Sequence, residues 1–432
     1  MFEVRPLRDA VGGQTGGGTP ARQVSSYWGG SIPWASVKDF ADKGDSLIAT
    51  AEHITHAGLQ ASASNLIPAG TPLVCTRMAV GRSAIATMPV AINQDVKALF
   101  PARGTSAAYL LRLLQYVQPR ADGAAVGSTV KGIRIQDYLS LEVPMAPQHE
   151  QDCIAQVLDT LDTTIRQTEA IIKKLKQVKQ GLLHDLLTRG IDANGELRPP
   201  QSEAPHLYKA SPLGWIPVEW DADQIRHVST LVTSGSRGWA DHYAEAGALF
   251  LRSQNVRMGY LDLSDRQHVV PPSGAEGERT RLNAGDLLIT ITGNGVGNVA
   301  SVNSNWTELA FVSQHVGLVR LVDPRLSQLA MHYLAPGAPG NQQLIDAQYG
   351  QSKPGLSLDG LRGLWIPIPS SEEQEQIIDR IMSAQNRIEI EGSYARQMRD
   401  LKSGLMDDLL TGRVRVTPLL QDRGQSSPEG TT

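Results

Sequence analysis

Cysteine and long apolar runs are both scarce in this chain of 432 residues. Its two cysteines, Cys75 and Cys153, are too few for a metal cluster and suggest no disulfide framework, which favours a reducing cytoplasm. No apolar run approaches the ~20 residues that a membrane span needs, and the N-terminus lacks the basic-then-apolar pattern of a secretion signal. We therefore expect a cytoplasmic protein, long enough for two or three domains with their own cores.

A strong excess of positive charge is also missing, because the net charge is −4. A nucleic acid could be bound only by cations gathered on one face, or with help from a partner. Signatures of catalysis are absent too: the chain has neither a Walker A motif nor the Asp/Asn-Pro-Pro-Tyr/Phe tetrapeptide of adenine methyltransferases. We therefore predict no catalytic residue in this chain.

Two sequence patterns resemble ligand sites, and both are weak. The glycine-rich run 293–297 is followed by strand-like NVASV and not by a helix, which disfavours a dinucleotide site and favours a tight turn. Glu52, His53 and His56 resemble part of a metal site, but no third ligand of the usual spacing is evident. We predict a loop or surface role for these residues and no metal.

The chain does contain a long internal repeat. Val143–Gly190 and Ile366–Arg413 align without a gap at a constant offset (366 − 143 = 223). The offset places Glu150-Gln151 on Glu373-Gln374, and it places the Asp-Leu-Leu-Thr at 185–188 on the same four residues at 408–411. So long an ungapped match indicates a duplication.

Apolar residues in both copies recur at steps of four and three, which predicts two long helices with a heptad seam. Forty helical residues span roughly 60 Å, and a rod of that length must bury its seam; the other copy is the nearest partner. Two unrelated surface helices are the alternative, which the shared register disfavours. The predicted seam residues are Ile154, Leu158, Leu161, Ile165, Leu175, Lys179 and Leu182 in the first copy, and Ile377, Ile381, Ile388, Met398, Lys402 and Leu405 in the second.

One of these seam positions is a lysine in both copies, Lys179 in the first and Lys402 in the second. A lysine in a heptad seam costs stability and commonly specifies register or orientation. We favour that role over the alternative, in which the lysines help to form a docking site for another protein.

The segments before the helices repeat as well, but more faintly; for example, Val80-Gly81 matches Val296-Gly297. We predict an α+β protein made of a tandem duplication, in which a mixed domain is followed by a long helix. The expected boundaries are a first mixed domain at 1–142, a helix at 143–190, a linker at 191–208, a second mixed domain at 209–365, a helix at 366–413 and a disordered tail at 414–432.

The motifs of this chain resemble those of type I restriction–modification specificity subunits. The likeness lies in the paired helices with their Gly-Leu-Leu/Met-x-Asp-Leu-Leu-Thr ends, the phrase SPLGWIPVEW from Ser211, the opening GGTP…YWGGSIPW, and SGSRGW from Ser234. The first domain lacks the GWIPxxW lead that precedes the second, which leaves its first strand in question.

The resemblance implies two target-recognition domains, each bound to one half of an asymmetric, split DNA target, on an antiparallel pair of helices with pseudo-two-fold symmetry. It implies a non-catalytic subunit on which methyltransferase subunits dock, two per chain, and which a translocating nuclease subunit can join. S-adenosylmethionine, ATP and Mg²⁺ would belong to those partners, and this chain would bind no cofactor. The helix length would then set the spacing of the half-sites, as dimer geometry does in repressors.

Candidate DNA contacts come from loops that combine planar and polar side chains. Arginine suits guanine, asparagine and glutamine suit adenine, and lysine and threonine suit phosphate. The alternatives are a surface ion pair for each arginine and a core position for each tryptophan. The candidates are Thr19, Tyr27, Trp34, Arg77, Arg82, Thr129 and Lys131 in the first domain, and Arg237, Trp239, Arg252, Ser253, Asn255, Arg257, Asn294, Gln314, His315, Ser352 and Lys353 in the second.

Within that set, the run RSQNVR at 252–257 is the densest, and Arg82 and Arg237 rank next because each lies beside or near a glycine. Two other functions compete with DNA specificity. One is a fused methyltransferase–nuclease with an unrecognised active site, and the other is a coiled-coil adaptor with no DNA role.

Overall fold

The structure is a computed structural model that describes residues 1–41, 45–127, 130–235, 237–271, 274–350 and 354–418. The chain divides into two compact units, each of which takes part of both long helices. Unit 1 is Met1–Ala170 with Gly392–Thr432, and unit 2 is Ile171–Glu391. Both cysteines are buried and unpaired, and no helix of the described residues is long and apolar enough for a membrane span.

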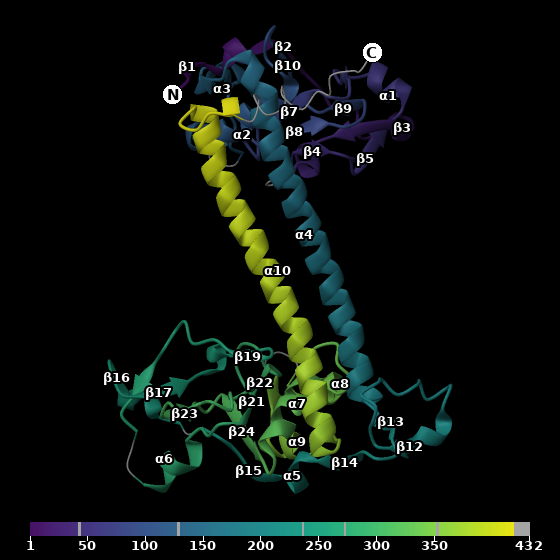
Figure 1. The fold of residues 1–432 in the computed structure, drawn as a ribbon, viewed down its shortest axis with the longest axis vertical. Coiled ribbons are helices and arrows are strands. Elements are labelled where there is room, and N and C mark those ends of the chain that lie inside the picture. Colours follow the sequence, from purple (N-terminus) through teal and green to yellow (C-terminus); the bar gives the residue numbers. More distant parts are fainter. Residues whose placement is uncertain (42–44, 128–129, 236, 272–273, 351–353, 419–432) are drawn as a thin grey trace, which may run out of the picture. The chain divides into compact units, whose positions relative to one another are not determined.

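Unit 1 contains two sheets and a covering helix (Figure 1). The five-stranded sheet has the order β2 (Val11–Gly16), β10 (Val96–Pro101), β7 (Pro72–Cys75), β8 (Ser83–Ala86) and β4 (Ser46–Leu47). The four-stranded sheet has the order β5 (Glu52–Ile54), β3 (Trp28–Ala35), β9 (Val90–Ile92) and β6 (Leu66–Ile67). β1 (Glu3–Pro6) pairs with β11 (Glu142–Met145). The short helices are η1 (Leu7–Ala10), η2 (Ser25–Tyr27), η3 (Val37–Asp39), α1 (His56–Gln60) and α3 (Ile135–Leu139).

Helix α2 (Ala107–Ala124) packs on the five-stranded sheet of unit 1 and buries an apolar face of Tyr109, Leu110, Leu113, Leu114 and Val117. Ser106 caps its N-terminus, because its hydroxyl accepts a hydrogen bond of 3.2 Å from the Tyr109 N–H.

Unit 2 repeats the arrangement. One sheet has the order β15 (Ser229–Ser234), β24 (Val316–Leu321), β21 (Leu287–Thr290) and β22 (Val299–Ser301). The other has the order β16 (Tyr243–Ala244), β20 (His268–Val269), β17 (Ala248–Leu251) and β23 (Ala310–Val312). The two-stranded pairs are β12 (Tyr208–Ser211) with β13 (Gly214–Pro217), β14 (Asp221–Gln224) with β27 (Trp365–Ile368), β18 (Val256–Arg257) with β19 (Tyr260–Leu261), and β25 (Gln348–Tyr349) with β26 (Gly355–Leu356). The helices are η4 (Pro205–Leu207), α5 (Ile225–Val228), η5 (Trp239–His242), η6 (Ser253–Asn255), α6 (Ala275–Thr280), α7 (Pro324–Leu334), α8 (Asn341–Asp346) and α9 (Leu358–Arg362).

The duplication extends to strand order and strand direction. The order β2-β10-β7-β8 in unit 1 corresponds to β15-β24-β21-β22 in unit 2. The parallel pair β3–β9 corresponds to the parallel pair β17–β23, and β1–β11 corresponds to β14–β27. The predicted α+β tandem repeat is therefore confirmed.

The two long helices match residue for residue. α4 is Gln148–Thr188 and α10 is Ser371–Thr411, each of 41 residues, so the offset of 223 holds at both ends. Each helix begins five residues later than predicted, because the first residues of the predicted spans belong to β11 and β27, which pair with other strands. Gly190, with a φ of +65°, follows the end of α4 in the left-handed conformation that favours glycine.

In each unit, separately, the helices run antiparallel. In unit 1, Asp162 of α4 pairs with Lys402 of α10, and Glu169 pairs with the earlier residue Arg399. In unit 2, Lys179 of α4 donates to Gln385 of α10. Every predicted seam residue is buried or half-buried, and Ile154, Leu158, Ile377 and Ile381 are almost fully buried.

The seam lysine of each unit forms a polar contact between the two helices, which we call the polar layer. Its partner is a carboxylate in unit 1 and a neutral amide in unit 2. The Lys402 Nζ donates to the Asp162 carboxylate at 2.5 Å, and the fully buried Arg112 of α2 donates to the same carboxylate at 2.7 Å. In unit 2, Lys179 Nζ donates to the Gln385 amide oxygen at 2.6 Å. Gln385 is the repeat equivalent of Asp162 (385 − 162 = 223), so the two lysines bridge the helices at equivalent positions.

Two segments outside the helices are more ordered than the sequence suggests. The predicted linker 191–208 contains Arg198, which is 5% exposed and pairs with Glu373 of α10 at 2.5 Å. At the start of the predicted tail, Arg415 pairs with Glu150 of α4, and Val416 is buried. The extended start of the first domain is present as β1, and the Phe2 N–H donates to the carbonyl of Thr411 at the end of α10.

We expect Asp162→Asn to destabilise the chain, because the buried Arg112 and the partly buried Lys402 would lose their shared counter-charge. Removing one partner from a buried ion pair costs about 3 kcal/mol. Urea unfolding of the full chain measures the loss. The control is Gln385→Ala at the equivalent neutral position, which should cost about 1 kcal/mol. Equal losses in the two variants would contradict the proposed difference between the layers.

We also expect a pH dependence that arises from His332 of α7. Burial and the positive charge of Lys179 lower the pKa of His332 to about 4. Because the unfolded chain takes up this proton near pH 6.5 and the folded chain does not, stability should fall as the pH drops from about 6.5 to about 4. His332→Gln should reduce the change of the urea midpoint with pH between about pH 6.5 and 4. The control is His184→Gln, at an exposed histidine on α4, which should leave this pH dependence as it is in the wild type.

Candidate nucleic-acid interface

In unit 1, three segments meet at one end of the five-stranded sheet, and we call them the first loop edge. They are the β7–β8 loop (76–82), the β9–β10 turn (93–95) and residues 130–133. Backbone hydrogen bonds connect them. The Thr76 N–H donates to the carbonyl oxygen of Asp95 at 2.8 Å, and the Met78 N–H donates to that of Lys131 at 2.8 Å. The Ile133 N–H donates to the carbonyl oxygen of Thr76 at 2.9 Å. The three segments therefore form one continuous surface.

Three of the candidate residues lie together on this first loop edge. Arg77 is half-exposed and pairs with Asp95 at 3.2 Å, and Lys131 is exposed. Thr19 donates to the amide oxygen of Gln94 at 2.7 Å, so it joins the edge through the β9–β10 turn. The edge thus combines a guanidinium, an ammonium, a hydroxyl and an amide, which are groups that contact phosphates and base edges.

Unit 2 has an equivalent second loop edge, formed by residues 291–298, 313–315 and 354–356. Ile291 N–H donates to the carbonyl of His315 at 2.9 Å, and Leu356 N–H donates to Ile291 at 2.8 Å. The Thr292 hydroxyl lies 2.7 Å from Nδ1 of His315, and the side chain of Gln314 lies beside the same ring. Asn294 lies on the loop, and Ser253 lies beside Gly293, so four candidates gather here.

The arginines of the run 252–257 are held by acidic neighbours. Arg252 pairs with Asp265 at 3.0 Å, and Arg257 lies 3.5 Å from Asp262. Asn255 is 2% exposed, and its amide donates to the carbonyls of Asp262 and Asp265 at 2.9 Å each. This run organises its own loop, and only Ser253 of the run faces Gly293 of the second loop edge.

The two candidate tryptophans are core residues. Trp34 is 2% exposed, and its indole N–H donates to the carbonyl of Gly18 and to the hydroxyl of Ser64, both at 3.1 Å. Trp239 is 3% exposed and stacks on Phe250 with 5.4 Å between ring centroids. Neither indole can contact a base in this structure. Both tryptophans therefore occupy core positions, which was the alternative to a DNA contact.

Apart from Arg82, which lies at the end of the β7–β8 loop, the remaining candidates lie away from the loop edges or outside the described residues. Tyr27 lies at the start of β3, at the opposite end of that strand from the edge. Arg82 closes the β7–β8 loop by donating to the carbonyl of Phe40 at 3.3 Å. Arg237 is exposed beside η5. Thr129, Ser352 and Lys353 lie outside the residues that the structure describes.

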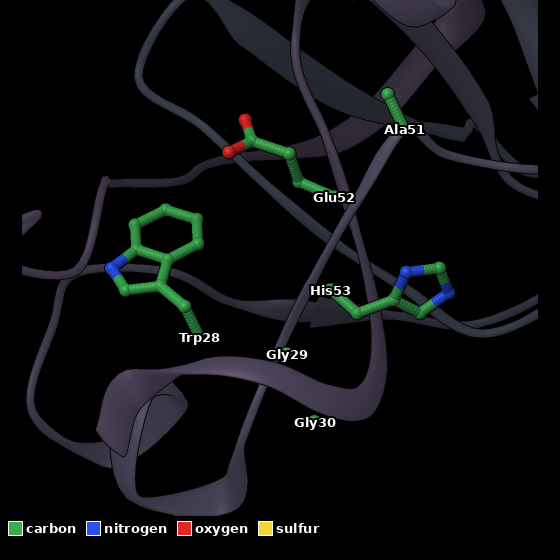
Figure 2. Close-up of a pocket in the computed structure, with 6 residues that line it drawn as sticks. All are labelled: Trp28, Gly29, Gly30, Ala51, Glu52 and His53. Carbon is green, nitrogen blue, oxygen red and sulfur yellow. The ribbon is translucent and has the colours of Figure 1, made fainter. Parts of the chain in front are cut away.

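A hollow of about 320 Å³ lies at the start of β3, lined by Trp28, Gly29, Gly30, Ala51, Glu52 and His53. Figure 2 shows the Glu52 carboxylate on the side of Trp28, while the His53 ring points away from it. The guanidinium of Arg22 lies 3.9 Å from the centre of the Trp28 ring and pairs with Glu52, whose pKa this bond lowers. Glu52 is therefore engaged by an arginine, and the described residues contain no group of three possible metal ligands.

Sequence patterns missed several residues that shape these surfaces. Arg22 and Gln94 lack a distinctive motif, and their partners Glu52 and Thr19 are 30 and 75 residues away in the sequence. Met78 was missed because an isolated methionine in a loop gives no signal, although its position matches that of Gly293 in the second domain (293 − 78 = 215, the offset that places Leu73 on Leu288).

The fold is a duplicated module, in which each mixed domain packs against the start of a long helix. Residues 2–177 match the family model described as the type I restriction modification DNA specificity domain. This match covers the first mixed domain and part of α4, and it agrees with the resemblance of the helical motifs to those of type I restriction–modification specificity subunits. The matched model describes a DNA specificity domain and not a catalytic one.

Individual relatives support the assignment. The chain is 23% identical over 313 residues to the type I restriction enzyme MjaVIII specificity subunit of Methanocaldococcus jannaschii, with 72% of this chain and 71% of that protein covered. It is 31% identical over 188 residues to the EcoR124I/EcoR124II specificity subunit of Escherichia coli, with 41% and 46% covered.

Solved structures share the fold. The S subunit of a type I restriction–modification system from M. genitalium superposes with a TM-score of 0.55 at 14% identity, over 95% of this chain and 96% of that one. A second chain, from a structure that describes complex assembly and conformational transition of the type I R-M system, gives a TM-score of 0.57 at 13% identity, over 96% and 98%.

Proposed function

We propose that this chain selects the DNA target of a type I restriction–modification complex, with each mixed domain bound to one half of an asymmetric, split sequence. One observation carries the proposal: the two domains share a scaffold but differ at equivalent places on their loop edges. Where the first edge has Asn93-Gln94-Asp95, the second has Ser313-Gln314-His315. Two different sets of base-contacting groups on one scaffold suit two different half-sites. The spacing of the half-sites remains a prediction from helix length.

The chemistry is carried by partner subunits in this proposal. Two methyltransferase subunits dock on each chain and methylate adenine with S-adenosylmethionine, and a nuclease that uses ATP and Mg²⁺ is the further partner. This chain binds no cofactor and works in the cytoplasm, where the DNA is. The docking is supported by large exposed apolar side chains on the outer surface of the helices, such as Ile171 and Val178 on α4 and Met382 and Ile390 on α10.

The function can be tested by expressing the chain with its methyltransferase partner in a host that has no other restriction–modification system. Long-read methylome sequencing should show adenine methylation at one bipartite sequence, and purified chain alone should transfer no methyl groups. Methyl transfer by the chain alone would favour the fused enzyme, whereas a complex that forms but neither methylates nor shifts DNA would favour the adaptor.

Exchanging residues 7–141 for those of another family member should change one half of the methylated sequence and leave the other half intact. These limits keep β1 and β11 paired in their native register, and the donor should retain an arginine at the position of Arg112 so that α2 still contacts Asp162. Methylome sequencing reads out both halves at once. A change in both halves would show that the domains do not act independently.

Gln314→Ala should relax the sequence requirement at one base pair of one half-site, because its amide is placed on the second loop edge. A lost amide–adenine pair costs about 1–3 kcal/mol of discrimination. The control is Gln342→Ala on α8, whose amide donates to Asp346 within its own helix. An unchanged methylated sequence for Gln314→Ala would remove this residue from the interface.

A further inference from the structure

Met78 has a backbone conformation that is rare for its residue type. Its φ is +65°, and it is the one residue other than glycine with a positive φ in the described part of the chain. The Ala79 N–H donates to the carbonyl of Arg77 at 2.8 Å, which closes a γ-turn around Met78. A γ-turn with a positive central φ is strained. The turn projects a side chain that is 63% exposed.

The strained turn is held on all sides by backbone hydrogen bonds. The Met78 N–H itself donates to Lys131, Gly81 N–H donates to Cys75 at 2.9 Å, and Arg82 N–H donates to Ala79 at 3.1 Å. Arg77 also forms a β-bridge with Gly132. The backbone of Met78 is therefore fixed, so little backbone freedom remains to be lost when the side chain binds.

Folding does not require a methionine at this place. An exposed side chain gains little from burial, and the positive φ adds a cost that glycine would avoid. The second domain has Gly293 at the equivalent position, with a φ of +88°. An apolar, strained and exposed side chain therefore serves a purpose other than stability, and strained residues of this kind concentrate at functional sites.

We propose that Met78 is an apolar wedge that the first domain inserts between neighbouring base pairs of its half-site. The inference rests on the proposed function. Methionine is among the side chains that unstack base steps from the minor groove. Arg77 and Lys131 flank the turn, and their cations are placed to contact the phosphates on either side of an opened step. These flanking cations favour DNA over a protein partner as the occupant.

The proposal predicts an asymmetry between the half-sites. The first half-site contains a step that is unstacked and bent, so an easily deformed pyrimidine–purine step should be preferred there. The second half-site is approached by Gly293, which has no side chain to insert. One half of the target is therefore recognised partly through the deformability of its DNA.

The test uses the complex of the full chain with its methyltransferase subunits and a duplex that carries the methylome-defined target. 2-Aminopurine replaces single adenines, and a rise in its fluorescence reports unstacking. The wild-type complex should raise the fluorescence at one step of the first half-site and at no step of the second. Met78→Gly should abolish the rise and weaken DNA binding about tenfold or more, the usual effect of losing one specific contact. Met78→Leu should retain the rise.

A stability measurement separates this role from a structural one. Met78→Gly relieves the backbone strain, so its unfolding midpoint should be at least as high as that of the wild type while its DNA binding falls. The matched control is Ile48→Ala, another exposed apolar residue (76%) of the same domain, which follows β4 at the opposite end of the sheet. It should change neither fluorescence nor affinity.

Three results would overturn the wedge. They are an unchanged fluorescence rise in Met78→Gly, a wild-type complex that binds its target without unstacking any step, and loss of the methyltransferase subunits from Met78→Gly on co-purification, which would make Met78 a protein contact. Failure of the proposed function is a different result, since the wild-type complex would then show no preference for the target at all.

Discussion

The antiparallel helix pair depends on a carboxylate at the start of each helix and an arginine that follows the end of the other. In unit 1, Glu150 in the first turn of α4 accepts from Arg415, which lies four residues beyond α10. In unit 2, Glu373 in the first turn of α10 accepts from Arg198, which lies ten residues beyond α4, and also from the indole of Trp220 at 2.9 Å. A carboxylate is favourable at a helix N-terminus. An arginine beyond a C-terminus can reach it only if the helices run in opposite directions.

These contacts explain why the repeat keeps Glu-Gln at the same place in both helices. Gln151 donates to the carbonyl of Ala146, and Gln374 donates to Pro369, so each amide closes the turn that leads into its helix. The glutamate then accepts a hydrogen bond from the arginine in the segment that follows the partner helix. Both residues act at a junction between three segments, and a change in one would leave a buried polar group unpaired, which is costly. The helix seam, by contrast, has Leu161 in one copy and Ala384 at the equivalent position of the other, and both are half-buried.

The sequence predicts the helices and their register better than the domains. A heptad pattern over 41 residues is a local signal that is repeated many times, so chance agreement is excluded. The strands of the mixed domains are short and buried on both faces, as in Pro72–Cys75, and therefore show no alternation. The predicted helix began too early because a strand was missed. Val143–Met145 belong to β11, whose partner β1 lies about 140 residues earlier in the sequence.

Single residues of the interface were harder to predict because their partners are not visible in sequence. The run RSQNVR looked like a dense set of DNA contacts, yet Asp262 and Asp265 in the next loop engage its arginines and its asparagine. The two tryptophans looked planar and polar, yet both fill cores. Gln314 and His315 lie in the turn between β23 and β24, and both side chains are half-buried there.

The backbone of each loop edge explains how two domains can bind different sequences on one scaffold. Ile133 N–H donates to Thr76 in the first domain, and Leu356 N–H donates to Ile291 in the second. Asn93 N–H donates to Ala35, and Ser313 N–H donates to Leu251. Because main-chain groups hold the edges together, the side chains between them carry little of the fold's stability and can differ. Met78 and Gly293 illustrate that freedom: both have a positive φ at equivalent positions, but only the methionine adds a side chain there, at a cost in backbone strain.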